Sequence, residues 1–252
     1  MTQCIPTLFN FQDLGSREVV ASFDGQHITS DAGGLLLREV EAQFRFIEQF
    51  SLCFSDFRDP DLIEHTLSEL LKQRIFALCL GYEDLNDHDQ LRHDPLLAVL
   101  AGKTDPMGHK RLRQRDRGKA LAGKSTLNRL ELTHGKANAQ SRYKKIAAHL
   151  DRMQGFLVDA FLQQHAVPPA RIVLDLDSTD FPLHGHQLGR FFHGYYDCYC
   201  YLPLYIFCGD HPLLALLRPS SIDNTAGVLK HLARIIQQFP VSLLETAYIK
   251  SR

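Results

Sequence analysis

The chain has 252 residues, of which 44% are hydrophobic and 23% are charged, and its formal net charge is −1. These values are ordinary for a soluble globular protein with one large or two smaller domains, and they exclude a low-complexity chain. No apolar stretch could span a bilayer, and none of the six cysteines forms a C-x-x-C pair. We therefore expect no membrane association, no zinc ribbon, and a reducing, cytoplasmic environment.

The first half of the chain is predicted to be mostly helical. Residues 17–30 predict a hairpin that turns at Asp24-Gly25. Apolar residues at helical spacing predict helices over 32–50, 61–80, 94–101, 126–133 and 139–165. The expected apolar face of the first helix consists of Leu36, Val40, Phe44 and Ile47. The expected N-caps are Ser30 or Asp31 for the first helix and Ser125 for the fourth, and the third helix is expected at Asp94-Pro95.

The periodicity changes after "VPPA" (167–170), which is the best candidate for a domain boundary. Strands are expected over 171–177, 189–201, 202–208 and 213–218. A helix capped by Asp223-Asn224 and ended by Pro240 follows them. The fold class predicted is therefore mixed α and β, with a helical region over 1–168 and an α/β region over 169–252.

The strand expected at 171–177 contains two carboxylates. Because side chains alternate along a strand, Ile172 and Leu174 share one face while Asp175 and Asp177 share the other, about 7 Å apart. Two such carboxylates can hold a divalent metal ion. Alternatively, one aspartate caps the following turn and the other pairs with an arginine, such as Arg171 or Arg190.

Basic residues are concentrated between Lys103 and Lys145, where 13 Lys or Arg face three acids. Such clustering is the electrostatic pattern expected for a phosphate backbone. The alternative is a solvated charged loop. The residues that we expect to contact DNA are Lys110, Arg111, Arg113, Arg115, Arg117, Lys119, Lys124 and Arg129.

The segment "GRFFHGYYDCYCY" (189–201) is rich in aromatic residues. Alternating Phe and Tyr residues are typical of a sheet core. Stacking of one or two rings on nucleic-acid bases is the alternative.

Four segments of the chain resemble one family. They are "DGQHITSDAGGLLLREVE", "DPDLIEHTLSELLKQRIFALCLGYEDLNDHDQLRHDP", "LAGKSTLNRLE" and "LDLDSTDFPLHGHQLGRFFHGYYDCYCYLPLYIFCGD" with the "LRPS" that follows it. Together, over about 20–238, they look like a DDE transposase of a bacterial insertion sequence. The resemblance implies an RNase H-like catalytic core whose first strand, here 171–178, carries the first acid of the triad. It also implies Mg²⁺ or Mn²⁺ as cofactor and the double-stranded ends of the insertion sequence as substrate.

The family's D-x-T signature falls on Asp177-Ser178-Thr179, so the resemblance makes Asp177 the first choice for a catalytic metal ligand and Asp175 the second. The second acid of the family usually lies on a strand after the helix that ends at Pro240, and the third is a glutamate further on. Neither can be placed here, since Asp210, Asp223 and Glu245 are poor substitutes by position. We therefore expect a C-terminally truncated core.

Two functional hypotheses follow. The first is a metal-dependent DNA strand transferase that is catalytically incomplete, with homo-oligomers or mixed oligomers with a full-length transposase as expected assemblies. The second is a non-catalytic DNA-binding remnant or an inhibitor of transposition.

Overall fold

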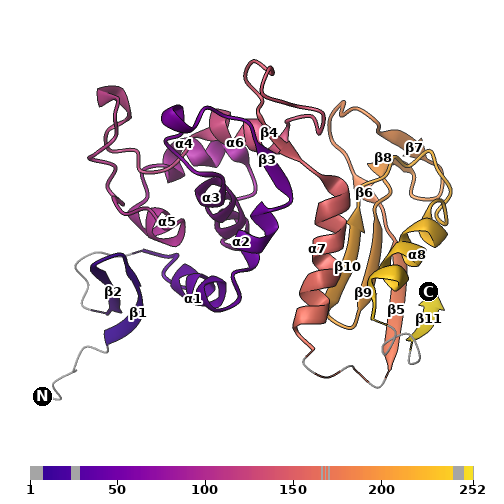
Figure 1. The fold of residues 1–252 in the computed structure, drawn as a ribbon. Coiled ribbons are helices and arrows are strands. Elements are labelled where there is room, and N and C mark those ends of the chain that lie inside the picture. Colours follow the sequence, from indigo (N-terminus) through magenta and orange to yellow (C-terminus); the bar gives the residue numbers. More distant parts are fainter. Residues whose placement is uncertain are drawn as a thin grey trace, which may run out of the picture. The chain divides into compact units, whose positions relative to one another are not determined.

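The computed structural model describes residues 8–23, 29–165, 167, 169, 171–240 and 247–251. By its contacts the chain divides into two units, Met1–His149 and Leu150–Arg252 (Figure 1). The fold class is mixed α and β, as predicted. The division precedes the last helix of the expected helical region, whereas the boundary expected at residue 168 follows it. Among the described residues, no helix has both the length and the apolar character needed to cross a membrane.

The first unit consists mainly of short helices with two small antiparallel sheets, β1-β2 and β3-β4. Its strands are β1 (Leu8–Leu14), β2 (Arg17–Ser22), β3 (Phe54–Asp56) and β4 (Ile146–Ala148). Its helices are α1 (Gly34–Phe44), α2 (Phe46–Ser51), α3 (Leu67–Cys79), α4 (His88–Leu91), α5 (Pro95–Leu100) and α6 (Lys124–Glu131), with 3₁₀ turns at Pro60–Leu62, Leu85–Asp87 and Gln114–Asp116.

Helix α3 lies in the core of the first unit. It begins with a capping box, because Thr66 Oγ1 accepts from the Glu69 amide while Glu69 accepts from the Thr66 amide. Its Leu70 and Ala77 are fully buried, and α5, α6 and β4 contribute further side chains to the same cluster. The loop between α5 and α6 is thereby anchored at both of its ends.

Of two expectations for the N-terminal segment, the hairpin over 17–30 is not tested at its turn and the single helix over 32–50 is wrong. Strand β2 pairs with β1, which precedes it, and Gly15 with φ of +64° lies in the turn. The Asp24-Gly25 turn that we predicted lies outside the described residues. The helix expected over 32–50 begins at Gly34 without a side-chain cap, and it is divided at Arg45, whose φ is +51°.

The buried face of α1 also differs from the expected one. Leu36, Val40 and Phe44 are exposed, while Arg38 and Glu41 are buried. The guanidinium of Arg38 donates to the carbonyls of two residues of β1, and Glu41 accepts from backbone amides at the start of α2. Apolar periodicity missed this face because its polar members are buried through hydrogen bonds.

Three further helix boundaries differ from those expected. The helix predicted over 61–80 begins only at Leu67, after the 3₁₀ turn. Helix α6 begins at Lys124 with Gly123 as N-cap, so Ser125 lies inside it and does not cap it. Residues 139–165 form β4 and then α7 (Leu150–Gln163), which belongs to the second unit. The helix predicted over 94–101 is confirmed as α5, and Asp94 is its N-cap.

The second unit contains a four-stranded sheet in the order β10-β9-β5-β11. Strand β5 pairs antiparallel with β9, β9 antiparallel with β10, and β11 parallel with β5. A second sheet has the order β6-β8-β7. The strands are β5 (Ile172–Ser178), β6 (Phe181–Pro182), β7 (Phe191–His193), β8 (Cys198–Tyr201), β9 (Leu204–Cys208), β10 (His211–Leu216) and β11 (Ala247–Ser251), and the helices are α7 and α8 (Val228–Gln238).

Helices α7 and α8 pack on one face of the four-stranded sheet (Figure 1). Ile172 and Leu174 of β5 are buried in that cluster together with Phe161 of α7 and Ile235 of α8. Only one face of β5 is therefore covered by this core. This arrangement explains why the strand tolerates acidic residues on its other face.

Two expectations for the second unit are wrong. The segment 189–201 is not one strand but the hairpin of β7 and β8, in which Asp197 has φ of +51°. Helix α8 has Gly227 as its N-cap, with φ of +78°. Asp223 instead accepts from the backbone amide of Thr225 (2.8 Å) in the preceding turn.

Candidate functional site

The acidic strand β5 presents Asp177 and Asp175 on the face opposite to its buried residues. Asp177 is exposed and Asp175 is half-buried, whereas Ile172 and Leu174 are fully buried. In the register with β9, Asp177 lies opposite Tyr205 and Asp175 opposite Phe207. Both carboxylates therefore lie toward the C-terminal end of the strand, on one face, as the alternation predicts.

Arg218 holds the end of this strand. Its guanidinium donates to Ser178 Oγ (2.8 Å) and to the carbonyls of Leu202 (3.0 Å), Ala226 (2.8 Å) and Asn224 (3.2 Å). Ser178 Oγ in turn donates to the Asn224 carbonyl (3.1 Å). The residue next to Asp177 is thus fixed to the loop that precedes α8.

The acids of β5 fit a magnesium or manganese ion in number and chemistry. Mg²⁺ prefers oxygen ligands and is usually held by one or two carboxylates, with water and phosphate oxygens completing its shell. Among the described residues, no group of three His, Cys, Asp or Glu side chains could hold a metal ion. Asp177 and Asp175 are two carboxylates of the kind that such an ion uses.

Of the substitutes that we judged poor from the sequence, Asp210 is far from Asp177 in the strand register. Asp210 follows β9, and because Asp177 pairs near the start of β9, Asp210 lies toward the opposite end of the sheet. Asp223 is engaged with Thr225. Glu245 lies outside the described residues. Strand β11, which follows α8 and lies beside β5, contains no carboxylate in its sequence "AYIKS".

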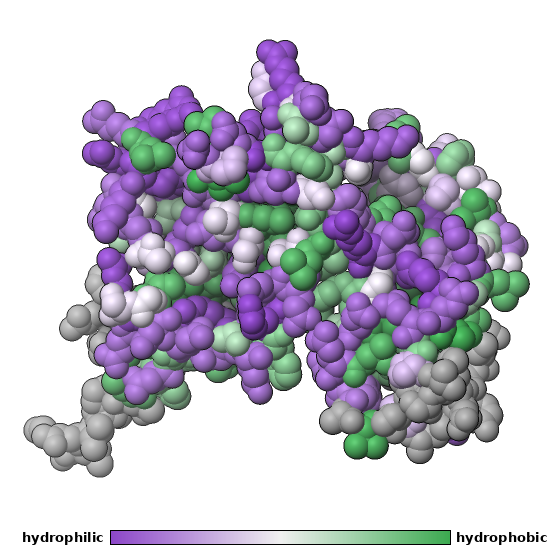
Figure 2. All heavy atoms as spheres, viewed as in Figure 1, coloured by the Kyte–Doolittle hydropathy of each residue, from purple (hydrophilic) through white to green (hydrophobic). Residues whose placement is uncertain are grey.

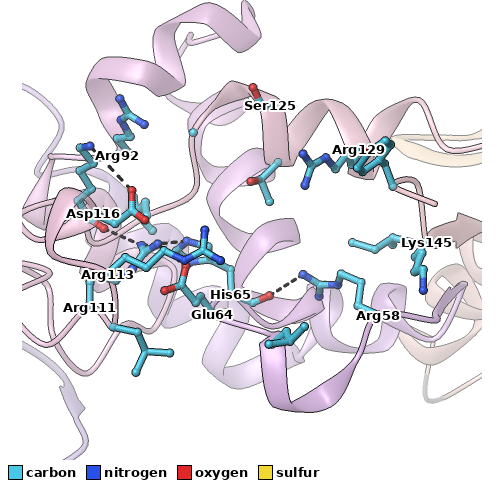
Figure 3. Close-up of a pocket in the computed structure, with 18 of the residues that line it drawn as sticks. Arg58, Glu64, His65, Arg92, Arg111, Arg113, Asp116, Ser125, Arg129 and Lys145 are labelled. Carbon is cyan, nitrogen blue, oxygen red and sulfur yellow. Dashed lines mark hydrogen bonds and ion pairs between the residues drawn. The ribbon is translucent and has the colours of Figure 1, made fainter. Parts of the chain in front are cut away.

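A separate cationic pocket lies in the first unit. It is an open cavity of about 590 Å³ whose lining includes eight Arg or Lys and five Asp or Glu side chains. Figure 3 shows Arg111 and Arg113 on one side of the cavity and Arg58 and Arg129 on the other. The surface of this unit around α6 and the α5–α6 loop is mostly hydrophilic (Figure 2).

Four of the eight residues expected to contact DNA line this pocket, namely Arg111, Arg113, Lys119 and Arg129. Lys124 lies with Arg129 at an adjacent depression that is also lined by α6. Lys110, Arg115 and Arg117 are exposed but line neither cavity.

The cations of the pocket differ in their availability. Arg111 is largely internal, since it donates to Glu64 (2.9 Å), to His65 Nε2 (3.0 Å) and to the Lys119 carbonyl (2.7 Å). Arg113 and Arg129 are exposed and form no ion pair with any described residue. These two can meet an anionic ligand without first losing an acidic partner.

His65 fixes Arg111 at the floor of the pocket. Burial, and then the positive charges of Lys103, Arg111 and Arg58, lower the pKa of His65 to about 3. Its imidazole is therefore neutral at physiological pH and can accept the Arg111 hydrogen bond through Nε2. A neutral histidine adds no charge of its own to the cavity.

Four pocket residues were missed as individual candidates, namely Arg58, Arg92, Arg142 and Lys145. Arg142 and Lys145 lie within the basic segment between Lys103 and Lys145. The excess of basic residues in that segment was therefore the signal that could have identified them. Arg58 follows β3, far away in the chain, and it is held by Asp56 and by the carbonyl of His65. No local pattern places it beside α6.

The comparisons with known proteins agree with the resemblance seen in the sequence. A model of the family described as transposase DDE domain group 1 matches residues 11–249. The searches of curated proteins and of solved structures gave no match. Since the match covers most of both units, the chain belongs to the family of DDE-domain transposases of group 1.

Proposed function

We propose that this chain acts as a metal-dependent but catalytically incomplete DNA strand transferase at the ends of an insertion sequence, with Asp177 and Asp175 as metal ligands. The exposed Asp177, on a strand whose other residues are buried or half-buried, is the observation that carries the proposal. When bound, Mg²⁺ or Mn²⁺ would supply activation of the attacking hydroxyl and stabilisation of the leaving 3′ oxygen. Asp177 and Asp175 would hold that ion, and Arg218 would keep the end of their strand in place.

The topology of the second unit supports an RNase H-like core. Three antiparallel strands, β5, β9 and β10, are followed by α8, which crosses back so that β11 lies parallel to β5. The first acid of the family lies on the first of these strands. This is where Asp177 stands.

The cationic pocket and the α5–α6 loop would hold the DNA. Arg113 and Arg129 offer unpaired positive charge across a cavity, and phosphate contacts of this kind supply most of the sequence-independent affinity for a duplex. The expected cation contacts at Lys110, Arg115, Arg117 and Lys124 extend this surface along the loop and α6.

The experiment compares nicking of end-labelled insertion-sequence DNA by the wild-type chain, Asp177→Asn and Asp210→Asn in Mn²⁺. Wild type and Asp210→Asn should nick at equal rates, and the nicking rate of Asp177→Asn should be lower by at least about a hundredfold. Equal nicking by Asp177→Asn would refute the assignment of Asp177.

A second candidate function is that of a non-catalytic DNA-binding remnant that inhibits transposition by occupying ends or joining mixed oligomers. It is favoured by the finding that, among the described residues, no three His, Cys, Asp or Glu side chains are grouped so that they could hold a metal ion. Salt-dependent DNA binding without nicking, combined with inhibition of a full-length transposase in trans, would support this function over the first.

A further inference from the structure

The small sheet β6-β8-β7 has one face made of aromatic rings. Because directly opposed residues of antiparallel strands share a face, the pairs Phe181–Tyr201 and Phe192–Tyr199 lie on one face of the sheet. We call these four residues the aromatic face. They come from all three strands of the sheet.

The aromatic face points outward. Phe181, Phe192 and Tyr199 are 55%, 54% and 48% exposed. On the opposite face of the same sheet, Cys200 is fully buried and its partner Phe191 is 46% exposed. The sequence-based expectation that these rings form a sheet core is therefore wrong for this face, and the stacking alternative gains support.

An arginine is fixed over one of the rings. The guanidinium carbon of Arg190 lies 4.4 Å from the ring centroid of Tyr199, and Phe192 meets Tyr199 edge-on at 5.6 Å. Arg190 also donates to the Gly185 carbonyl (2.5 Å) and to His186 Nδ1 (2.8 Å). The positive charge is thus held against the rings by two further contacts and carries no acidic partner among the described residues.

We propose that the aromatic face binds unpaired nucleotides of the DNA substrate, whose bases stack on Tyr199 and Phe192 while Arg190 meets a neighbouring phosphate. Exposed rings interleaved with a cation suit single-stranded nucleic acid, because every base has a face that can stack and every linkage a negative charge. A paired duplex hides its base faces, so the occupant is unpaired.

The position of the face along the chain connects it with the proposed metal site. Strand β6 begins at Phe181, shortly after β5 ends at Ser178. The negative charges of Asp180 and Asp177 contribute to a raised pKa of Tyr196, after the larger effect of burial, so the β7–β8 turn lies within their electrostatic reach. A strand cleaved beside Asp177 would have its terminal bases near these rings. This inference rests on the proposed function.

The test measures the affinity of the whole chain for a fluorescent twelve-nucleotide single strand and for the matching duplex. Phe192→Ala and Tyr199→Ala should each weaken single-strand binding by about tenfold and change duplex binding less than twofold. Tyr199→Phe keeps the ring and should retain affinity. Arg190→Lys keeps the positive charge but lacks the planar guanidinium, so its affinity for the single strand should fall by about threefold.

The matched control is Tyr195→Ala, whose ring is 86% exposed in the β7–β8 turn but does not belong to the aromatic face. It should bind the single strand as wild type does. Photo-crosslinking with 5-iodouracil in the same oligonucleotide should label Tyr199 or Phe192, which a variant that merely fails to fold cannot mimic.

Unchanged single-strand affinity in the Phe192→Ala/Tyr199→Ala double variant would overturn the proposal. It would also be overturned if the only property that changed in this variant were its self-association, measured by sedimentation. Failure of the proposed function is distinguishable, since it would appear as absent nicking by a wild-type chain that still binds the single strand. Normal nicking with unaltered single-strand binding by the double variant would refute the aromatic face alone.

Discussion

The guanidinium of Arg218 donates a 2.8 Å hydrogen bond to the hydroxyl of Ser178, the residue that follows Asp177. Arg218 is only 5% exposed, and its other donors reach three backbone carbonyls. One buried side chain thus ties the end of the acidic strand to β8–β9 and to the loop before α8. The position of Asp177 therefore depends on Arg218, which lies 41 residues later in the sequence.

Arg218→Ala should destabilise the second unit by about 2–4 kcal/mol, because it leaves several buried acceptors without their donor. Hydrogen exchange of the amides of β5 and β9 measures this locally. Lys230→Ala removes an exposed cation of the same unit and should change exchange by less than about 0.5 kcal/mol. Equal protection in the Arg218→Ala variant and the wild type would contradict the role of Arg218.

Acidification should destabilise the first unit through two buried histidines. The pKa of His65 is lowered to about 3 and that of His88 to about 4, in both cases mainly by burial, whereas the ordinary value is 6.5. The unfolded chain therefore binds more protons than the folded chain between these values. The stabilisation is complete above pH 6.5 and is lost as the pH falls toward 4 and then 3.

Within that window the free energy of unfolding should fall by about 1.4 kcal/mol per pH unit for each histidine. Thermal unfolding from pH 7 to pH 4 measures this slope. His88→Gln should flatten it, whereas His109→Gln, in the exposed part of the α5–α6 loop, should not. An identical slope in His88→Gln would show that another group titrates.

Arg113→Ala and Arg129→Ala should weaken duplex binding and lower its salt dependence. Each variant removes one exposed cation of the pocket, so the slope of log affinity against log salt should decrease by about one. Fluorescence anisotropy at several salt concentrations measures the slope. Arg17→Ala removes an exposed cation of β2 outside the pocket and serves as the control. Unaltered slopes in both pocket variants would place the DNA elsewhere.

Gly108→Ala should distort the α5–α6 loop. Gly108 has φ of +67°, and a Cβ there would lie 2.7 Å from the Ala120 amide nitrogen and 2.8 Å from the Lys119 carbonyl carbon. Gly118 also has positive φ, of +79°, but open space around it. Both alanine variants have the strain of a positive φ, but only Gly108→Ala also has the clash. Thermal unfolding should therefore show Gly108→Ala to be about 1–3 kcal/mol less stable than Gly118→Ala. Equal stability of the two would exclude a close approach at Gly108.

Local patterns were sufficient for some elements and not for others. The Asp94-Pro95 start of α5 and the strand that carries Asp177 follow from short-range rules of capping and alternation. The core face of α1 did not follow, because Arg38 and Glu41 are buried against carbonyls and amides of neighbouring segments. Apolar periodicity cannot recognise a polar side chain whose partners lie elsewhere in the chain.

The sequence by itself determined that Asp175 and Asp177 share one face of a strand, because alternation is a property of the extended backbone and needs no partner. It also determined where positive charge is concentrated. Only the tertiary structure decided that Arg58 comes to the same cavity as Arg113 and Arg129, and that the rings of β6, β7 and β8 lie outward. These arrangements depend on pairing and packing between segments distant in sequence, and local side-chain patterns do not specify such contacts.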